Sequence, residues 1–203
     1  MKKQEFLNIC GEVYAFHIPR WHELPEFDLY MDQVIALAEK YLSVLSPDNK
    51  ELITPSMINN YVKSGVLPPP KNKKYNRTHL ALIMIICSTK SVLEISTIAD
   101  IVNKITDKGG VEQLLDSFAG MYEGALTQSV NKARNIVEAQ SDADILSVIA
   151  IENAVNASAA RTVALYAYKE ISKKVTPESE KEDKKSEKKS KKTKKDSESL
   201  EDK

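Results

Sequence analysis

Apolar side chains recur at intervals of three and four residues along most of the chain, the spacing of one face of an α-helix. Six stretches show this spacing or are apolar almost throughout: residues 28–45, 54–64, 79–92, 94–105, 111–139 and 142–173. The third is apolar nearly all round from Leu80 to Cys87, which predicts a helix buried on several sides, although periodicity alone leaves a buried strand open. A short linker between the last two predicts an antiparallel hairpin. The pattern as a whole predicts an all-α fold.

Prolines, glycines and charge runs divide the chain into four predicted parts: an irregular strap, residues 1–27; a central helical domain, residues 28–108; a helical hairpin, residues 109–175; and a disordered charged tail, residues 176–203. Two prolines break any helix in the strap, and Gly109-Gly110 marks the boundary before the hairpin. The tail has almost no apolar side chain with which to form a core. A hairpin of two helices buries too little alone, so it is expected to pack on the central domain or on a second copy.

The most informative stretch runs from Thr54 to Asn76. Thr54 is a suitable N-cap, and the proline after it fits the first helical position, where its missing N–H costs nothing. A glycine and three prolines then end the helix. One face of this helix is apolar, and the opposite face carries Ser56, Asn59, Asn60 and Lys63. Such side chains can reach base edges and phosphates, but an ordinary solvated face remains the alternative.

Charge is segregated although the formal net charge of the chain is zero. Residues 54–106 hold seven basic and two acidic side chains, a balance of +5, whereas residues 1–53 hold five basic and nine acidic ones, a balance of −4. A basic loop contributes much of this excess, with Lys71, Lys73, Lys74 and Arg77 around Tyr75. The loop is suited to a phosphate backbone, with the tyrosine as a brace, although a basic loop by itself is usually only solvated.

Other chemistries find little support in the sequence. No Ser-His-Asp, Cys-His or phosphate-binding glycine arrangement indicates an enzyme, and no cofactor is expected. His17 and His22 lack the further ligands of a metal site. The absence of a signal peptide, of a membrane-spanning run and of cysteine motifs predicts a cytoplasmic protein without a membrane partner. A small-molecule effector is left undetermined. A pocket between the hairpin and the central domain is left open, with Trp21, Tyr122 or Tyr166 as its lining, although such aromatic residues more often belong to a core.

The segment MINNYVKSGVLPPP, followed by KKYNRTHLALIMIICSTKSVLEISTIADIV, resembles the DNA-binding head of MerR-type regulators. Gly65-Val66-Leu67-Pro68-Pro69 matches the exit of their recognition helix, Tyr61 its aromatic residue, Lys73-Lys74-Tyr75 their wing, and Ile98–Val102 the short helix that follows. Asn59 and Asn60 stand where those regulators usually carry Arg and Tyr. The segments IPRWHELPEFDLYMDQVI and LITPSMINNYVKSG also resemble a bacterial family known only as domain of unknown function number eighteen thirty-six, itself regarded as MerR-like.

These resemblances imply a winged helix-turn-helix domain that binds double-stranded DNA as a transcriptional regulator. Its helix would enter the major groove, the basic wing would bind phosphates, and a homodimer through residues 111–173 would place two heads on neighbouring half-sites. The alternative is a helical protein-interaction module that uses the same helices as a scaffold.

Overall fold

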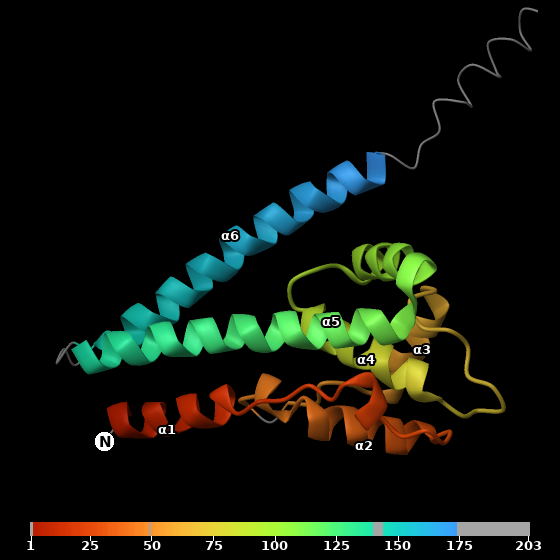
Figure 1. Ribbon diagram of the computed structural model, residues 1–203, viewed down its shortest axis with the longest axis horizontal. Helices are drawn as coiled ribbons and strands as arrows, with labels where there is room; N and C mark the ends of the chain where they lie inside the picture. The colour runs from red at the N-terminus through yellow and green to blue at the C-terminus, as the bar shows by residue number, and fades with distance from the viewer. Residues whose placement is uncertain (1, 49, 140–143, 174–203) are drawn as a thin grey trace, which may run out of the picture. The chain divides into compact units, whose positions relative to one another are not determined.

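The computed structural model describes residues 2–48, 50–139 and 144–173, and every regular element in these ranges is a helix, which confirms the all-α prediction (Figure 1). The elements are α1 Lys2–Tyr14, η1 Trp21–Glu23, α2 Met31–Tyr41, η2 Ser43–Leu45, α3 Pro55–Lys63, α4 Arg77–Thr89, α5 Ile95–Ala139 and α6 Ile145–Lys173, of which η1 and η2 are 3₁₀ turns. The chain divides into two compact units, Met1–Arg161 and Thr162–Lys203. The predicted tail, residues 176–203, lies outside the described residues.

α4 is the central helix of the first unit. Its ten consecutive residues from His79 to Ser88 are buried, as its all-round apolar sequence predicts, and it packs against α2 and α5. The helix begins at Arg77, two residues before the predicted stretch 79–92. There the Asn76 side chain accepts a hydrogen bond from the backbone N–H of His79 at 3.3 Å. An N-cap amide satisfies one of the donors that every helix leaves unpaired at its start.

The N-terminus differs from the sequence prediction, because residues 2–14 form the helix α1 instead of an irregular strap. The segment contains no proline, and its apolar residues Phe6, Leu7 and Cys10 lie three and four positions apart. α1 packs along α5, and Figure 1 shows the two helices side by side. Phe6 and Leu7 contact a small core at the end of the hairpin, formed by Ala133, Val137, Ile145 and Ile149. The hairpin therefore obtains part of its core from the start of the chain.

The irregular segment after α1 is held to α5 by polar contacts. Arg20 makes two hydrogen bonds to the carboxylate of Glu123, at 2.9 and 2.5 Å, and the backbone N–H of Ile18 donates to the same group at 2.8 Å. The backbone N–H of Trp21 donates to Asp116 at 2.8 Å. The hydrogen bonds from Arg20 are the main cause that lowers the pKa of Glu123, so this carboxylate stays charged at neutral pH.

α5 is one long helix with a single interruption at Gly110, whose φ of 77° and ψ of 168° are not helical. Figure 1 shows the chain changing direction sharply between the two parts of α5. The break falls within the predicted boundary at Gly109-Gly110. Buried residues on both sides of it, among them Val102 and Leu115, nevertheless belong to one hydrophobic core.

Candidate nucleic-acid interface

α3 is short, and hydrogen bonds define both of its ends. The Thr54 hydroxyl accepts a hydrogen bond from the backbone N–H of Met57 at 3.2 Å, and Pro55 occupies the first helical position. Gly65 adopts a φ of 74°, and the chain then turns so that the N–H groups of Val66 and Leu67 both donate to the carbonyl of Tyr61, at 3.2 and 3.1 Å. A glycine in this left-handed conformation is a common helix ending. The two residues after it are buried, so the helix end is anchored in the core.

The two faces of α3 differ as the sequence predicts. Ile58 and Tyr61 are buried, with 0 % and 4 % of their surface exposed. All four polar residues of the predicted contact face are exposed: Ser56, Asn59, Asn60 and Lys63. A row of hydroxyl, amide and ammonium groups on one side of a rigid helix is able to form hydrogen bonds with base edges and phosphates.

The basic loop after α3 contains a tight turn from Lys71 to Lys74. Asn72 and Lys73 both adopt positive φ, 51° and 62°, and the N–H of Lys74 donates to the carbonyl of Lys71 at 2.9 Å. Two consecutive positive φ values are typical of the type I′ turn that joins paired strands. In the described part of the chain this pairing amounts to isolated bridges, one across the turn and one between Leu29 and Tyr75. The turn is therefore a tight bend with little strand pairing.

The lysines of this region face solvent to different degrees. Lys63, Lys71 and Lys73 are exposed, whereas Lys74 is half-buried with its ammonium 5.4 Å from the centre of the Tyr30 ring. None of the four forms an ion pair with a carboxylate among the residues that the structure describes. Unpaired surface ammonium groups close in sequence are the usual partners of nucleic-acid phosphates.

Two residues of the predicted set lie inside the fold instead. Tyr75 is buried, its ring is edge-on to His79 at 5.3 Å, and burial raises the pKa of its hydroxyl. Its backbone exchanges two hydrogen bonds of 2.8 Å with Leu29. Arg77 donates to the carbonyls of Leu24, at 2.9 Å, and Pro25, at 3.4 Å. Both residues therefore support the turn from within.

Arg77 is also held by two side chains of the irregular segment. Its guanidinium lies 5.3 Å from the centre of the Trp21 ring and 3.2 Å from the carboxylate of Glu26. Only 17 % of the Arg77 side chain is exposed. A guanidinium engaged by a ring, a carboxylate and two carbonyls has few donors left for a phosphate.

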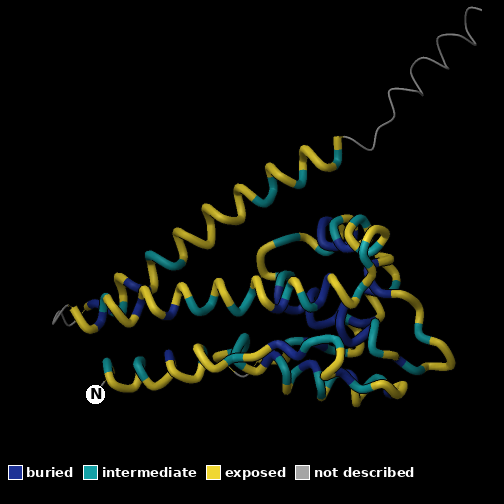
Figure 2. The backbone as a smooth tube through the Cα atoms, viewed as in Figure 1, coloured by how far each residue is buried: buried dark blue, intermediate teal, exposed yellow. Residues whose placement is uncertain are grey.

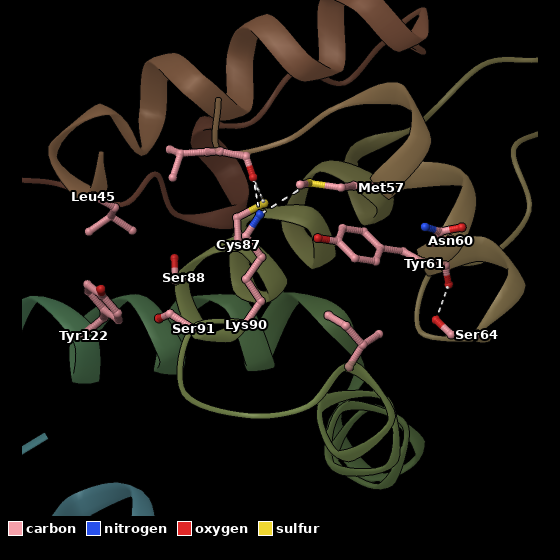
Figure 3. Close-up of a pocket in the computed structure, with 12 residues that line it drawn as sticks. Leu45, Met57, Asn60, Tyr61, Ser64, Cys87, Ser88, Lys90, Ser91 and Tyr122 are labelled. Atoms are coloured by element: carbon pink, nitrogen blue, oxygen red, sulfur yellow. Dashed lines mark hydrogen bonds between the residues drawn. The ribbon is translucent and has the colours of Figure 1, made fainter. Parts of the chain in front are cut away.

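A cleft of about 780 Å³ opens behind α3, and sequence reasoning did not find it (Figure 3). Tyr122 lines the cleft, in agreement with the candidate lining set, whereas Trp21 lies under Arg77 and Tyr166 belongs to the second unit. The other walls come from η2, α3, the end of α4 and the start of α5, in addition to Leu52. No sequence signal joins positions so far apart, so local pattern alone could not reveal the cleft.

The described residues, 2–48, 50–139 and 144–173, contain neither a cluster of metal ligands nor a helix suited to span a membrane. Within these ranges no three histidine, cysteine or acidic side chains gather as metal ligands would. No helix in the same ranges combines the length and the apolar character needed to cross a bilayer.

Comparison with known proteins identifies one family. The family described as a domain of unknown function (DUF1836) matches residues 19–125, more than half of the chain. The matched region contains α3, the basic turn and every wall of the cleft. No curated protein and no solved structure matches the chain. The chain therefore belongs to the DUF1836 family.

Proposed function

We propose that the protein is a sequence-specific DNA-binding regulator in which α3 enters the major groove. The observation that carries this proposal is the exposed polar face of α3, continued along the chain by a turn of lysines without carboxylate partners. Asn59 and Asn60 are the best candidates for base recognition, because an amide can form paired hydrogen bonds with adenine N6 and N7. The lysines would bind phosphates, which sets affinity and orientation without reading sequence.

The likeness to MerR-type heads supports the same assignment. The order of elements is that of a recognition helix, a proline exit, a basic turn and a long apolar helix, here α3, residues 68–70, residues 71–74 and α4. The connection from α2 to α3 spans residues 42–54, whereas a helix-turn-helix turn has about three or four residues. The proposal therefore relies on α3 and the basic turn and does not depend on a helix-turn-helix of standard connection length. The winged helix-turn-helix is only the fold type that these two elements resemble.

A homodimer through residues 111–173 completes this proposal. Two copies of α3 would then meet half-sites about one helical turn of DNA apart. A polar helix of nine residues offers few base contacts alone, and doubling it raises specificity without a larger head.

The proposal is tested by the different effects of two substitutions on DNA binding. Lys73→Ala should weaken binding to all sequences and lower the salt slope by about one unit, because one phosphate contact is lost. Asn59→Ala should cost about 1–3 kcal/mol at particular bases and leave the salt slope unchanged. Fluorescence anisotropy with fragments selected from a genomic pool measures both effects, and Lys108→Ala, at an exposed lysine in α5, is the charge-matched control.

Two results would contradict the proposal. The first is an absence of binding to the pooled fragments at low salt. The second is an equal loss of affinity in Lys73→Ala and Lys108→Ala, which would indicate a general charge effect without a defined interface.

A protein-interaction module is the second candidate, and the surface of α6 favours it. Val148, Ile151 and Val155 leave 51 %, 62 % and 59 % of their surface exposed. Contiguous exposed apolar surface on a soluble helix is typical of sites that bind another helix. Two results together would favour this function over DNA binding. A protein partner should co-purify in stoichiometric amount with the wild type but not with Ile151→Asp, and the protein should show no enrichment on DNA in cells.

A further inference from the structure

The cleft behind α3 has the size and lining of a small-molecule site. Its volume of about 780 Å³ falls within the range of roughly 300–1,000 Å³ of protein ligand pockets. Leu45, Leu52, Met57, Ile95 and Tyr122 supply apolar walls. Ligand sites typically combine such walls with a few polar groups that fix orientation. In this cleft, Lys90 and Tyr61 are the two polar residues best suited to fix the orientation of a ligand.

Lys90 places a positive charge in the wall of this apolar cleft. The residue is half-buried, and its ammonium donates to the carbonyl of Leu52 and lies 3.6 Å from the sulfur of Met57 (Figure 3). Among the described residues no carboxylate forms an ion pair with it. Glu39 is near enough to influence Cys87 electrostatically but does not pair with Lys90. A cation partly withdrawn from water, with only neutral neighbours in contact, favours an anionic ligand.

Tyr61 adds a hydrogen-bond donor to the same cleft. Only 4 % of the residue is exposed, and Figure 3 shows its hydroxyl pointing into the cleft on the side of Cys87 and Lys90. No hydrogen bond joins this hydroxyl to another of the described residues. Burial raises the pKa of Tyr61 to about 12, so the hydroxyl keeps its proton at neutral pH. The hydroxyl opens on the cleft, where it is able to donate a hydrogen bond to an acceptor of a ligand.

Cys87 does not compete with such a ligand. Its thiol is 3.8 Å from the Leu52 carbonyl, and burial raises the pKa of the thiol to about 11. The sulfur is therefore a neutral part of the wall, without the negative charge that would repel an acid or act as a nucleophile.

We propose that this cleft binds a small amphipathic acid, with its aliphatic or aromatic body against the apolar walls and its carboxylate or sulfonate on Lys90 and Tyr61. An inorganic anion would leave the apolar walls in contact with water. A neutral hydrocarbon would leave Lys90 without a counter-ion and the Tyr61 hydroxyl without an acceptor. The volume suits a molecule of drug size rather than a folded partner. The site does not require that α3 bind DNA, because Lys90 and Tyr61 do not belong to the proposed DNA-contact face, although Asn60 of that face lies at the edge of the cleft.

The probe for this site is 8-anilinonaphthalene-1-sulfonate, an aromatic sulfonate that fluoresces in apolar surroundings. N-phenyl-1-naphthylamine, which has the same ring body without the sulfonate, is the neutral comparison. Titrations of the full-length protein in the absence of DNA should show one saturable sulfonate site from which decanoate, but not decanol, displaces the probe. The neutral probe should bind more weakly, because it cannot pair with the ammonium.

Two substitutions separate the charge from the hydroxyl. Lys90→Gln should weaken sulfonate binding tenfold or more, and Tyr61→Phe should weaken it several-fold, because each removes one polar contact to an anion. Neither should change the affinity for the neutral probe. Lys104→Gln, at a half-buried lysine of α5 outside the cleft, is the matched control and should leave both affinities unchanged.

Circular dichroism melts identify variants that fail to fold. If Lys90→Gln is one of them, Tyr61→Phe decides, because it keeps the packing ring and removes only the hydroxyl. Absence of a saturable site overturns the proposal. Equal sulfonate affinity in the wild type and the folded cleft variants overturns it as well, as does a neutral probe that binds as tightly as the sulfonate.

Discussion

The buried histidine at the start of α4 takes part in the cap of that helix and predicts that the stability of the protein depends on pH. His79 is 5 % exposed, and its Nδ1 accepts a hydrogen bond from the backbone N–H of Asn76 at 3.1 Å. Its Nε2 is buried without a hydrogen bond of standard geometry, although the carbonyls of Pro68 and Pro69 lie nearby. Desolvation is the main cause that lowers the pKa of His79 below 6.5, so the folded protein holds this ring neutral.

Acidification should therefore destabilise the fold before its carboxylates titrate. Because the unfolded chain binds a proton at His79 more readily than the folded chain does, the stabilisation is present at pH 7.5 and is lost as the pH falls below about 6.5. His79→Gln should flatten this dependence. Urea unfolding at pH 7.5, 6.5 and 5.5 measures it, with His22→Gln at an exposed histidine as the control. If the free energy of unfolding of His79→Gln changes with pH as steeply as that of the wild type, His79 is not the group responsible.

At the scale of the element, α5 depends on one backbone conformation. Gly110 combines a φ of 77° with a ψ of 168°, a region that is essentially restricted to glycine. A Cβ at this position would meet no atom within 4 Å, so the backbone alone makes another residue costly. This bend allows both parts of α5 to bury their apolar residues in the same core as α4.

Two glycine substitutions in α5 should have opposite effects on stability. Gly110→Ala should lower the free energy of unfolding by about 1–3 kcal/mol, because alanine strains at positive φ. Gly120→Ala should raise it by about 0.5–1 kcal/mol, because that glycine is helical, exposed and free of nearby atoms. Chemical denaturation of both variants provides the comparison. Effects of the same sign would mean that the conformation of Gly110 is not required.

At the scale of the whole molecule, the end of the hairpin is covered unevenly. α1 contributes Phe6 and Leu7 to the small core around Val137 and Ile149, whereas the exposed side of α6 carries Ile151 and Val155. Figure 2 shows how much of α6 is exposed. A second copy of the same helix would cover this neutral, apolar surface without needing charge complementarity, and an isologous interface is the commonest arrangement in homodimers.

The proposed homodimer should therefore depend on this side of α6. Light scattering after size exclusion should give twice the chain mass of 22.7 kDa for the wild type. Ile151→Asp should give a monomer, because burying an unpaired carboxylate in an apolar interface is costly. Ala157→Asp places the same charge on another side of α6 and should remain dimeric. A wild-type protein that is monomeric at micromolar concentration would refute the dimer.

Sequence alone determined the features that depend on near neighbours. The α3 helix, its polar and apolar faces and its glycine ending could be predicted, because caps and helical periodicity involve residues a few positions apart. The burial of α4 followed from its continuous apolar sequence in the same way. Pro19 and Pro25 indicate irregular structure only in the segment around them, so they do not exclude the helix α1 that precedes them.

Tertiary structure decided everything that joins distant parts of the chain. The hydrogen bonds between Arg20 and Glu123 link positions 103 residues apart, and no local pattern indicates such a pair. Tyr75 and Arg77 could be recognised as parts of a basic loop, but their burial depends on Leu29 and Trp21, which the strap brings to them. The cleft behind α3 exists for the same reason, because its walls meet only after the chain has folded.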